Sequence, residues 1–173
     1  VCTFTFDRIN LAGSVIVQVK GNNALTLATR NHGDITVAAD LTLNGSTDGS
    51  AIAGGWKGGG AGGAGEGPGG GQLAAGAGGS YGGPGTGDAT PAIYGDFDLN
   101  ATVGGSGGSN SGAGGGGSIS LKAHGTGDVT ITSTSNIVAN GGEGATSANG
   151  SGSGGSIRIE GENISNAGQL HAK

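Results

Sequence analysis

The stretch Gly33-Asp34-Ile35-Thr36-Val37 returns 94 residues later as Gly127-Asp128-Val129-Thr130-Ile131. In both copies two aliphatic residues flank a threonine, and a Gly-Asp pair comes before them. Alternation with a period of two indicates a short strand that is buried on one face, and glycine with aspartate marks a turn. The chain therefore repeats a unit made of a turn and a short strand.

The repeat continues on both sides of this stretch. The same offset pairs Leu25-Thr26-Leu27 with Ile119-Ser120-Leu121, and the unit begins again at Gly155-Ser156-Ile157-Arg158-Ile159. One coil of such short strands cannot bury its apolar side chains alone, whereas stacked coils align like residues in columns. We therefore predict an all-β fold, a parallel β-helix (β-solenoid), as one domain over residues 1–173. The predicted inward positions are Leu25, Leu27, Ile35, Val37, Leu41, Leu43, Ile119, Leu121, Val129, Ile131, Ile137, Ile157 and Ile159.

Glycine supplies 45 of the 173 residues, about a quarter of the chain, against roughly 7% in average proteins. So much glycine disfavours long helices. Much of it falls in three runs, at 54–87, 104–117 and 141–155, which we expect to leave the solenoid as long glycine-rich insertions. Small residues recur every third position in the first run. That spacing suits packed polyproline-II segments, and a flexible loop is the alternative.

The composition also excludes several partners. The formal net charge of −5 argues against a nucleic-acid binder, which needs a basic face. No apolar stretch approaches the roughly 18–20 residues of a membrane helix. Cys2 is the only cysteine and has no internal partner. The chain opens on a strand-like run without an initiator methionine or a signal peptide, which suits a mature secreted product or a fragment.

Several segments resemble repeats of the filamentous-haemagglutinin type. They are Ala24-Leu25-Thr26-Leu27, Gly33-Asp34-Ile35-Thr36-Val37 and Asn163-Ile164-Ser165-Asn166-Ala167-Gly168-Gln169-Leu170-His171-Ala172. Gly154-Gly155-Ser156-Ile157-Arg158-Ile159 is similar to glycine-rich repeats of large microbial surface proteins. The resemblance implies a right-handed parallel β-helix on a secreted bacterial adhesin. It covers residues 11–45 and 117–173, and the glycine-rich middle departs from it.

The sequence offers little to catalysis or to metal binding. No Ser/His/Asp or Cys/His arrangement supports a nucleophilic mechanism, so we expect neither an enzyme nor a cofactor. Asp96, Asp98 and Asn100 have the spacing that starts a calcium loop. The glycine and the distal glutamate of such a loop are missing, so they form only a weak calcium candidate.

The ends of the predicted solenoid suggest a function. A β-solenoid ends in strand edges that accept another strand unless they are capped, and no obvious cap is visible at either end. Head-to-tail contact between such ends propagates into a filament. We therefore predict a secreted structural protein, a self-associating subunit or segment of an extracellular filament or surface layer. The assembly edges are Thr3, Phe4, Thr5, Phe6, Ile157, Ile159, Ile164 and Leu170.

Two other functions remain open. In an adhesin module, Trp56, Tyr81 and Tyr94 would contact glycans or a host surface. In an ice-binding protein, outward threonines would form a flat array; these are Thr26, Thr36, Thr42, Thr130 and Thr132. Glycosylation sequons stand at Asn44, Asn100, Asn149 and Asn163, and they carry information only for a eukaryotic source.

Overall fold

The described part of the chain winds into four coils of three short strands each. The computed structural model describes residues 1–72, 76–87, 92–96, 98–99 and 102–173, and these residues form strands and no helix. No helix able to cross a membrane occurs within these ranges. The strands are β1 (Cys2–Phe6), β2 (Ile9–Leu11), β3 (Ile16–Gln18), β4 (Leu25–Thr29), β5 (Ile35–Val37), β6 (Asp40–Thr42), β7 (Ser118–Lys122), β8 (Val129–Ile131), β9 (Asn136–Val138), β10 (Ser156–Glu160), β11 (Ile164–Asn166) and β12 (Gln169–His171).

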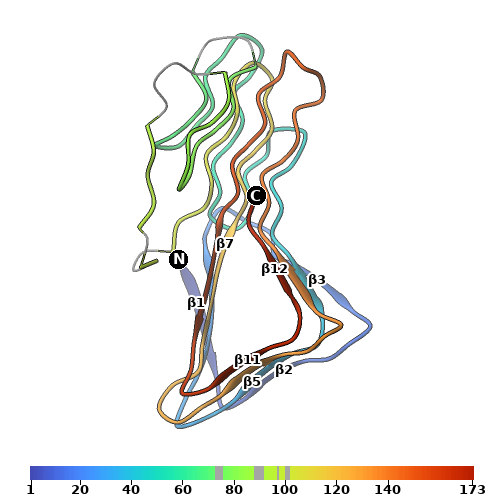
Figure 1. The fold of residues 1–173 in the computed structure, drawn as a ribbon, viewed down its shortest axis with the longest axis vertical. Coiled ribbons are helices and arrows are strands. Elements are labelled where there is room, and N and C mark those ends of the chain that lie inside the picture. Colours follow the sequence, from blue (N-terminus) through green and yellow to red (C-terminus); the bar gives the residue numbers. More distant parts are fainter. Residues whose placement is uncertain (73–75, 88–91, 97, 100–101) are drawn as a thin grey trace.

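Corresponding strands of successive coils form three four-stranded parallel sheets. Their orders are β1-β4-β7-β10, β2-β5-β8-β11 and β3-β6-β9-β12. Seen along the stack, the sheets form the three sides of a triangle, with the last coil nearest to the viewer (Figure 1). The prediction of an all-β stack of short parallel strands is confirmed.

The core lies inside the triangle, in the two middle coils. The register places Leu27 beside Leu121, and Ile35 beside Val129. Alternate residues of each strand therefore stack into inward columns, because side chains point to opposite faces of a strand. In these coils, the predicted inward residues that are fully buried are Ile35, Val37, Leu41, Leu43, Ile119, Leu121, Val129, Ile131 and Ile137. Burial of each such side chain contributes about 1.5–3 kcal/mol to stability.

One residue on the outer side of β7 is buried as well. Ser120 pairs with Thr26 and Arg158 in an outward column, yet it is only 4% exposed. Leu99 and Val103, which precede the second glycine run, lie over this face of the sheet. Arg158 donates to the carbonyl of Leu99, and Ser156 donates to that of Val103.

Asp and Asn side chains connect successive coils at the corners of the triangle. The backbone N–H of Asp128 donates to Oδ1 of Asp34, and that of Asn163 donates to Oδ1 of Asp128, both over 3.1 Å. We call this chain of contacts the Asp34 ladder. A second ladder runs through Asn44, Asn140 and Lys173, with both N–H to Oδ1 distances at 3.0 Å. In every step the side chain of one coil accepts an N–H from the next.

The glycine runs pack against one another beside the triangle. Figure 1 shows them as a row of extended segments above the sheets. Their backbones are hydrogen-bonded directly, for example from Gly59 N to Gly108 O at 2.8 Å. A Cβ on Gly107 would lie 1.9 Å from the carbonyl oxygen of Lys57, so no larger residue fits there. The described parts of these runs therefore form a packed layer rather than a loose loop.

Candidate assembly surfaces

The two outermost coils carry the candidate functional surfaces. β1, β2 and β3 stand at one edge of their sheets, and β10, β11 and β12 stand at the other. The outer side of β1–β3 is called the N-terminal face, and that of β10–β12 the C-terminal face. Each strand there pairs on one side only, so a row of N–H and C=O groups points outward at each face.

The N-terminal face is hollow and apolar. Phe4 is 53% exposed and Phe6 is 47% exposed. A hollow of about 340 Å³ opens between coil strands here and reaches Leu41 of the core, with Arg8 in its lining. Its apolar lining consists of Phe6, Ile9, Leu11, Val17, Leu25, Leu27 and Leu41. Most inward columns thus end at this face without a covering layer, whereas Ile9 is only 6% exposed.

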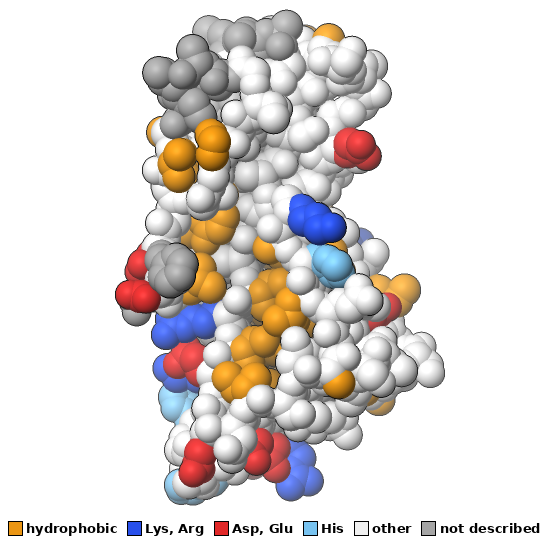
Figure 2. Space-filling model, in the orientation of Figure 1, with side chains coloured by type: hydrophobic (Ala, Val, Ile, Leu, Met, Phe, Trp, Pro, Cys, Tyr) orange, Lys and Arg blue, Asp and Glu red, His pale blue; other side chains and the backbone are white. Residues whose placement is uncertain are grey.

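The C-terminal face ends the same columns. Ile164 is 50% exposed and Leu170 is 41% exposed, while Ile157 and Ile159 are half-buried. Figure 2 looks onto this face and shows hydrophobic side chains gathered between the three sides of the triangle. Both faces therefore present apolar side chains surrounded by unpaired strand edges.

The predicted edge residues divide into two kinds. Phe4 lies in an inward column with Leu27, whereas Thr3 and Thr5 lie in outward columns with Thr26 and Ala28. Ile157 and Ile159 continue the inward columns on β10. Ile164 and Leu170 do the same on β11 and β12. The apolar edge residues thus all continue inward columns. The two threonines offer only their backbone groups to another strand.

Charged side chains stand outside the triangle. Glu160 pairs with Arg158 at 2.8 Å and with Lys122 at 3.4 Å. Asp7 pairs with Arg30 at 3.7 Å at a corner near the N-terminal face. Such partly exposed pairs contribute at most about 1 kcal/mol each. They lie on the surface of the stack, whose stability depends mainly on the apolar columns.

Two tyrosines meet at the border between the triangle and the glycine layer. The rings of Tyr81 and Tyr94 form an edge-to-face pair with centroids 5.0 Å apart. Tyr94 Oη donates to Gly104 O at 2.7 Å and accepts from Ser106 Oγ at 2.9 Å. Burial raises the pKa of Tyr94 to about 12, and burial raises the pKa of Tyr81 as well.

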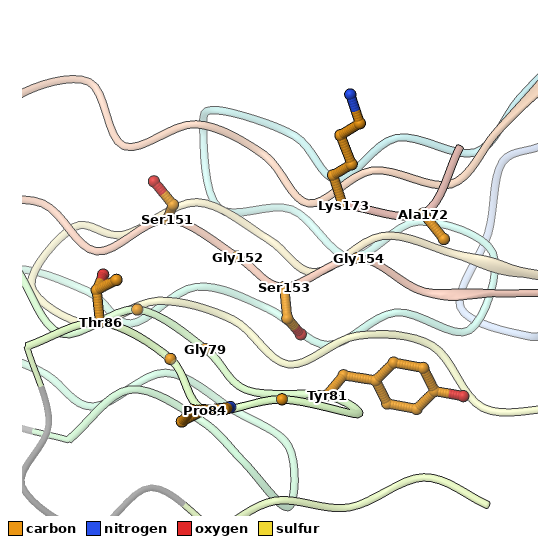
Figure 3. A pocket seen from close by; sticks show the side chains of 13 residues that line it. Gly79, Tyr81, Pro84, Thr86, Ser151, Gly152, Ser153, Gly154, Ala172 and Lys173 are labelled. Carbon is orange, nitrogen blue, oxygen red and sulfur yellow. The ribbon is translucent and has the colours of Figure 1, made fainter. Parts of the chain in front are cut away.

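Hollows flank this tyrosine pair. One, of about 370 Å³, is lined by both tyrosines together with Ile93, Asp96 and Leu99. Another, of about 320 Å³, runs between Tyr81, the segment around Ser153 and the last residues of the chain (Figure 3).

Trp56 was expected to join the tyrosines in a binding surface. It packs at Gly67, where a Cβ would lie 2.7 Å from the Trp56 ring and 2.6 Å from Ser106 Oγ. Trp56 is 41% exposed. Neither tyrosine hollow includes it in its lining.

The weak calcium candidate takes part in a turn. Asp96 Oδ1 accepts the backbone N–H of Asp98 at 3.1 Å. Asn100 lies outside the described residues. Across the ranges that the structure describes, no three His, Cys, Asp or Glu side chains are grouped to hold a metal ion.

Three of the four sequons fall at positions that the structure describes. The amide nitrogen of Asn163 donates to Asp128 at 2.9 Å, and that of Asn149 donates to Asn110 O at 2.6 Å. Asn44 belongs to a corner ladder. Glycosylation of Asn149 or Asn163 would replace one of the two hydrogens on the same nitrogen. The fourth sequon, Asn100, lies outside the described residues.

Sequence reasoning missed the corner ladders. The signal was present, because Asp34 and Asp128 share the repeat offset of 94, and Asn44 and Asn140 are 96 residues apart. Each of these residues was explained by its preference for turns, so the hydrogen bonds between coils were not recognised. The end faces and ladders suit contact with another β-coil, through apolar packing and backbone hydrogen bonds. No protein-family model, no curated protein and no solved structure matches this chain.

Proposed function

We propose that this chain is a structural protein, a self-associating subunit or segment of an extracellular filament or surface layer, in which further β-coils cover its end faces. One observation carries the proposal: both ends of the stack expose apolar side chains of the inward columns, whereas most column residues of the two middle coils are fully buried. Ile137 is fully buried, whereas its column neighbour Leu170 is 41% exposed. Covering apolar area contributes about 25 cal/mol per Å².

The strand edges support the same function. In the middle of the stack each strand bonds a parallel partner on both sides, as β4 does with β1 and β7. The outer strands lack the second partner. An uncovered and partly apolar edge is a template for another strand. Since the two faces differ, their contact is heterologous, and repetition of such a contact gives a fibre.

Two finer features belong to this proposal. The coils wind right-handed, which is the hand that about 98% of parallel strand connections adopt. The glycine-rich segments are polyproline-II helices, whose small faces allow the backbones to approach closely. Contacts such as Gly65 against Gly107 O, where a Cβ would lie 2.0 Å away, support this second point. An extracellular location rests on the likeness to secreted surface repeats.

The test is assembly of the purified chain. Light scattering and negative-stain microscopy should show particles that lengthen as the concentration rises. Leu170→Asp places a charge on the C-terminal face and should suppress lengthening. Ser165→Asp is the matched control, because Ser165 is exposed and pairs with Thr130 in an outward column. Uniform 16 kDa particles at every concentration would exclude the filament.

An adhesin function is the second candidate, and the hollow beside Tyr81 and Tyr94 favours it. Aromatic side chains beside an aspartate form a surface suited to sugars. A glycan array should lose its signals with Tyr81→Ala and keep them with Trp56→Ala, since Trp56 is not part of this hollow. Ice binding has weaker support. The outward column of β2-β5-β8-β11 contains only two threonines, between Asn10 and Ser165.

A further inference from the structure

We propose that the coil covering each end face belongs to a second copy of this chain, stacked head to tail and in register. In this arrangement β10, β11 and β12 of one copy pair with β1, β2 and β3 of the next. This inference rests on the proposed function and goes further, because it names the partner and the residue pairs.

The strand lengths of the two faces match. β1 and β10 have five residues each, and β2, β3, β11 and β12 have three each. Every coil follows the same order of one long strand and two short ones. The contact between copies would therefore repeat the coil-to-coil interface that already occurs three times within the chain.

The inward columns also continue across the contact. Within the chain, Cys2 shares a column with Leu25, Ile119 and Ile157. Extending each column by one coil brings apolar residues together at four places. These pairs are Ile157 with Cys2, Ile159 with Phe4, Ile164 with Ile9, and Leu170 with Val17 of the next copy. Only the pair of Asn166 with Leu11 combines a polar residue with an apolar one.

The Asp34 ladder favours head-to-tail over head-to-head contact. Each step offers a side-chain oxygen to the N–H of the following coil. The ladder begins at Asp34, because the preceding position in the column is Arg8. It reaches the C-terminal face at Asn163, which has an amide oxygen and already donates its Nδ2 to Asp128. That oxygen is placed to accept the backbone N–H of Arg8 from the next copy, and the N-terminal face has no equivalent acceptor in this column.

The native Cys2 provides the test. It is exposed and has no disulfide partner. Neighbouring parallel strands lie about 4.8 Å apart, within the Cα separation that a disulfide spans. In Ile157→Cys, each copy carries one thiol on each face. Mild oxidation should give a series of covalent trimers, tetramers and longer species on a non-reducing gel.

Three controls identify the register. Wild type and Cys2→Ser/Ile157→Cys have one thiol each, so neither can extend beyond a dimer. In Arg158→Cys with native Cys2, the new thiol is one residue away and in an outward column, and long species should be at least tenfold less abundant. Val17→Cys/Leu170→Cys/Cys2→Ser tests the same register on the third sheet, in case Ile157→Cys disturbs folding. Circular dichroism checks each variant.

Each result decides between the proposals. Long covalent species from both inward pairs support the register. Assembly by light scattering with at most dimers from both inward pairs would overturn the in-register stack and leave the filament standing. Equal yields from Arg158→Cys and Ile157→Cys would also overturn it. Absence of assembly at any concentration would overturn both proposals.

Discussion

The backbone N–H of Asn140 donates to Oδ1 of Asn44 over 3.0 Å, although 96 residues separate them in the chain. The first and second glycine-rich runs and the strands β7, β8 and β9 lie between the two residues. Asn44 precedes the long insertion and Asn140 precedes the third glycine-rich run, so two successive insertions leave the stack at adjacent positions. Local side-chain contacts at the corners hold the neighbouring coils in register there.

Removing a ladder carboxylate should destabilise the last coil. Asp128 Oδ1 accepts both the backbone N–H and the side-chain amide of Asn163, at 3.1 and 2.9 Å. Asp128→Ala should lower the free energy of unfolding by about 1–3 kcal/mol. Urea denaturation measures the loss. Asp128→Asn retains the acceptor oxygen and should recover most of it; equal losses from both variants would show that the ladder contributes little.

Two residues of one inward column should differ in how much they contribute to stability, because one lies in the core and the other on the C-terminal face. Ile137 is fully buried and Leu170, beside it on β12, is 41% exposed. At concentrations where the chain is monomeric, Ile137→Ala should cost about 2–5 kcal/mol of unfolding free energy. Leu170→Ala should cost clearly less. Denaturant midpoints at one concentration test the difference, and similar shifts would mean that the C-terminal face is already covered.

The glycine layer predicts a contrast between two alanine substitutions. Gly107→Ala would place a Cβ 1.9 Å from the carbonyl oxygen of Lys57, whereas a Cβ on Gly83 meets nothing within 4 Å. Gly107→Ala should destabilise at the upper end of the about 1–3 kcal/mol typical of overpacking. Gly83→Ala should be neutral or stabilise by up to about 1 kcal/mol. Thermal unfolding of both variants is the measurement. Equal melting temperatures would indicate that the layer is loose.

The tyrosine pair predicts a loss of stability at high pH. Burial raises the pKa of Tyr94 from 10.0 to about 12. Because the folded protein holds this proton more tightly than the unfolded chain, its contribution is complete below pH 10 and disappears as pH rises toward about 12. Native absorbance at the phenolate band should therefore titrate late. Tyr94→Phe should flatten the decline in stability between these pH values; an unchanged slope would contradict the assignment.

The fold was predictable because its signal is periodic. Ile35 and Val129 recur at a constant offset with the same neighbours, and strands of alternating residues need no distant information to be recognised. The sequence left both a packed layer and a flexible loop open for the glycine-rich runs. Gly59 and Gly108 are hydrogen-bonded to each other, but they have no side chains whose pattern would reveal the contact. At the candidate surfaces, the apolar edge residues were found from the same alternation. The Asp34 ladder was missed because its bonds join coils that a local pattern treats separately.

The proposed stack also predicts how assembly depends on salt. Two residues before the column of Ile9 and Ile164, the register brings Asp7 of the next copy over Glu162. These like charges oppose stacking, and salt screens them, since the Debye length falls from about 10 Å at 0.1 M to about 3 Å at 1 M. Light scattering should therefore show stronger assembly at higher salt. Glu162→Lys turns this repulsion into an attraction, so it should strengthen assembly at low salt and weaken the salt dependence. The same substitution with no effect at low salt would contradict this register at the corner, because opposite charges so placed must attract.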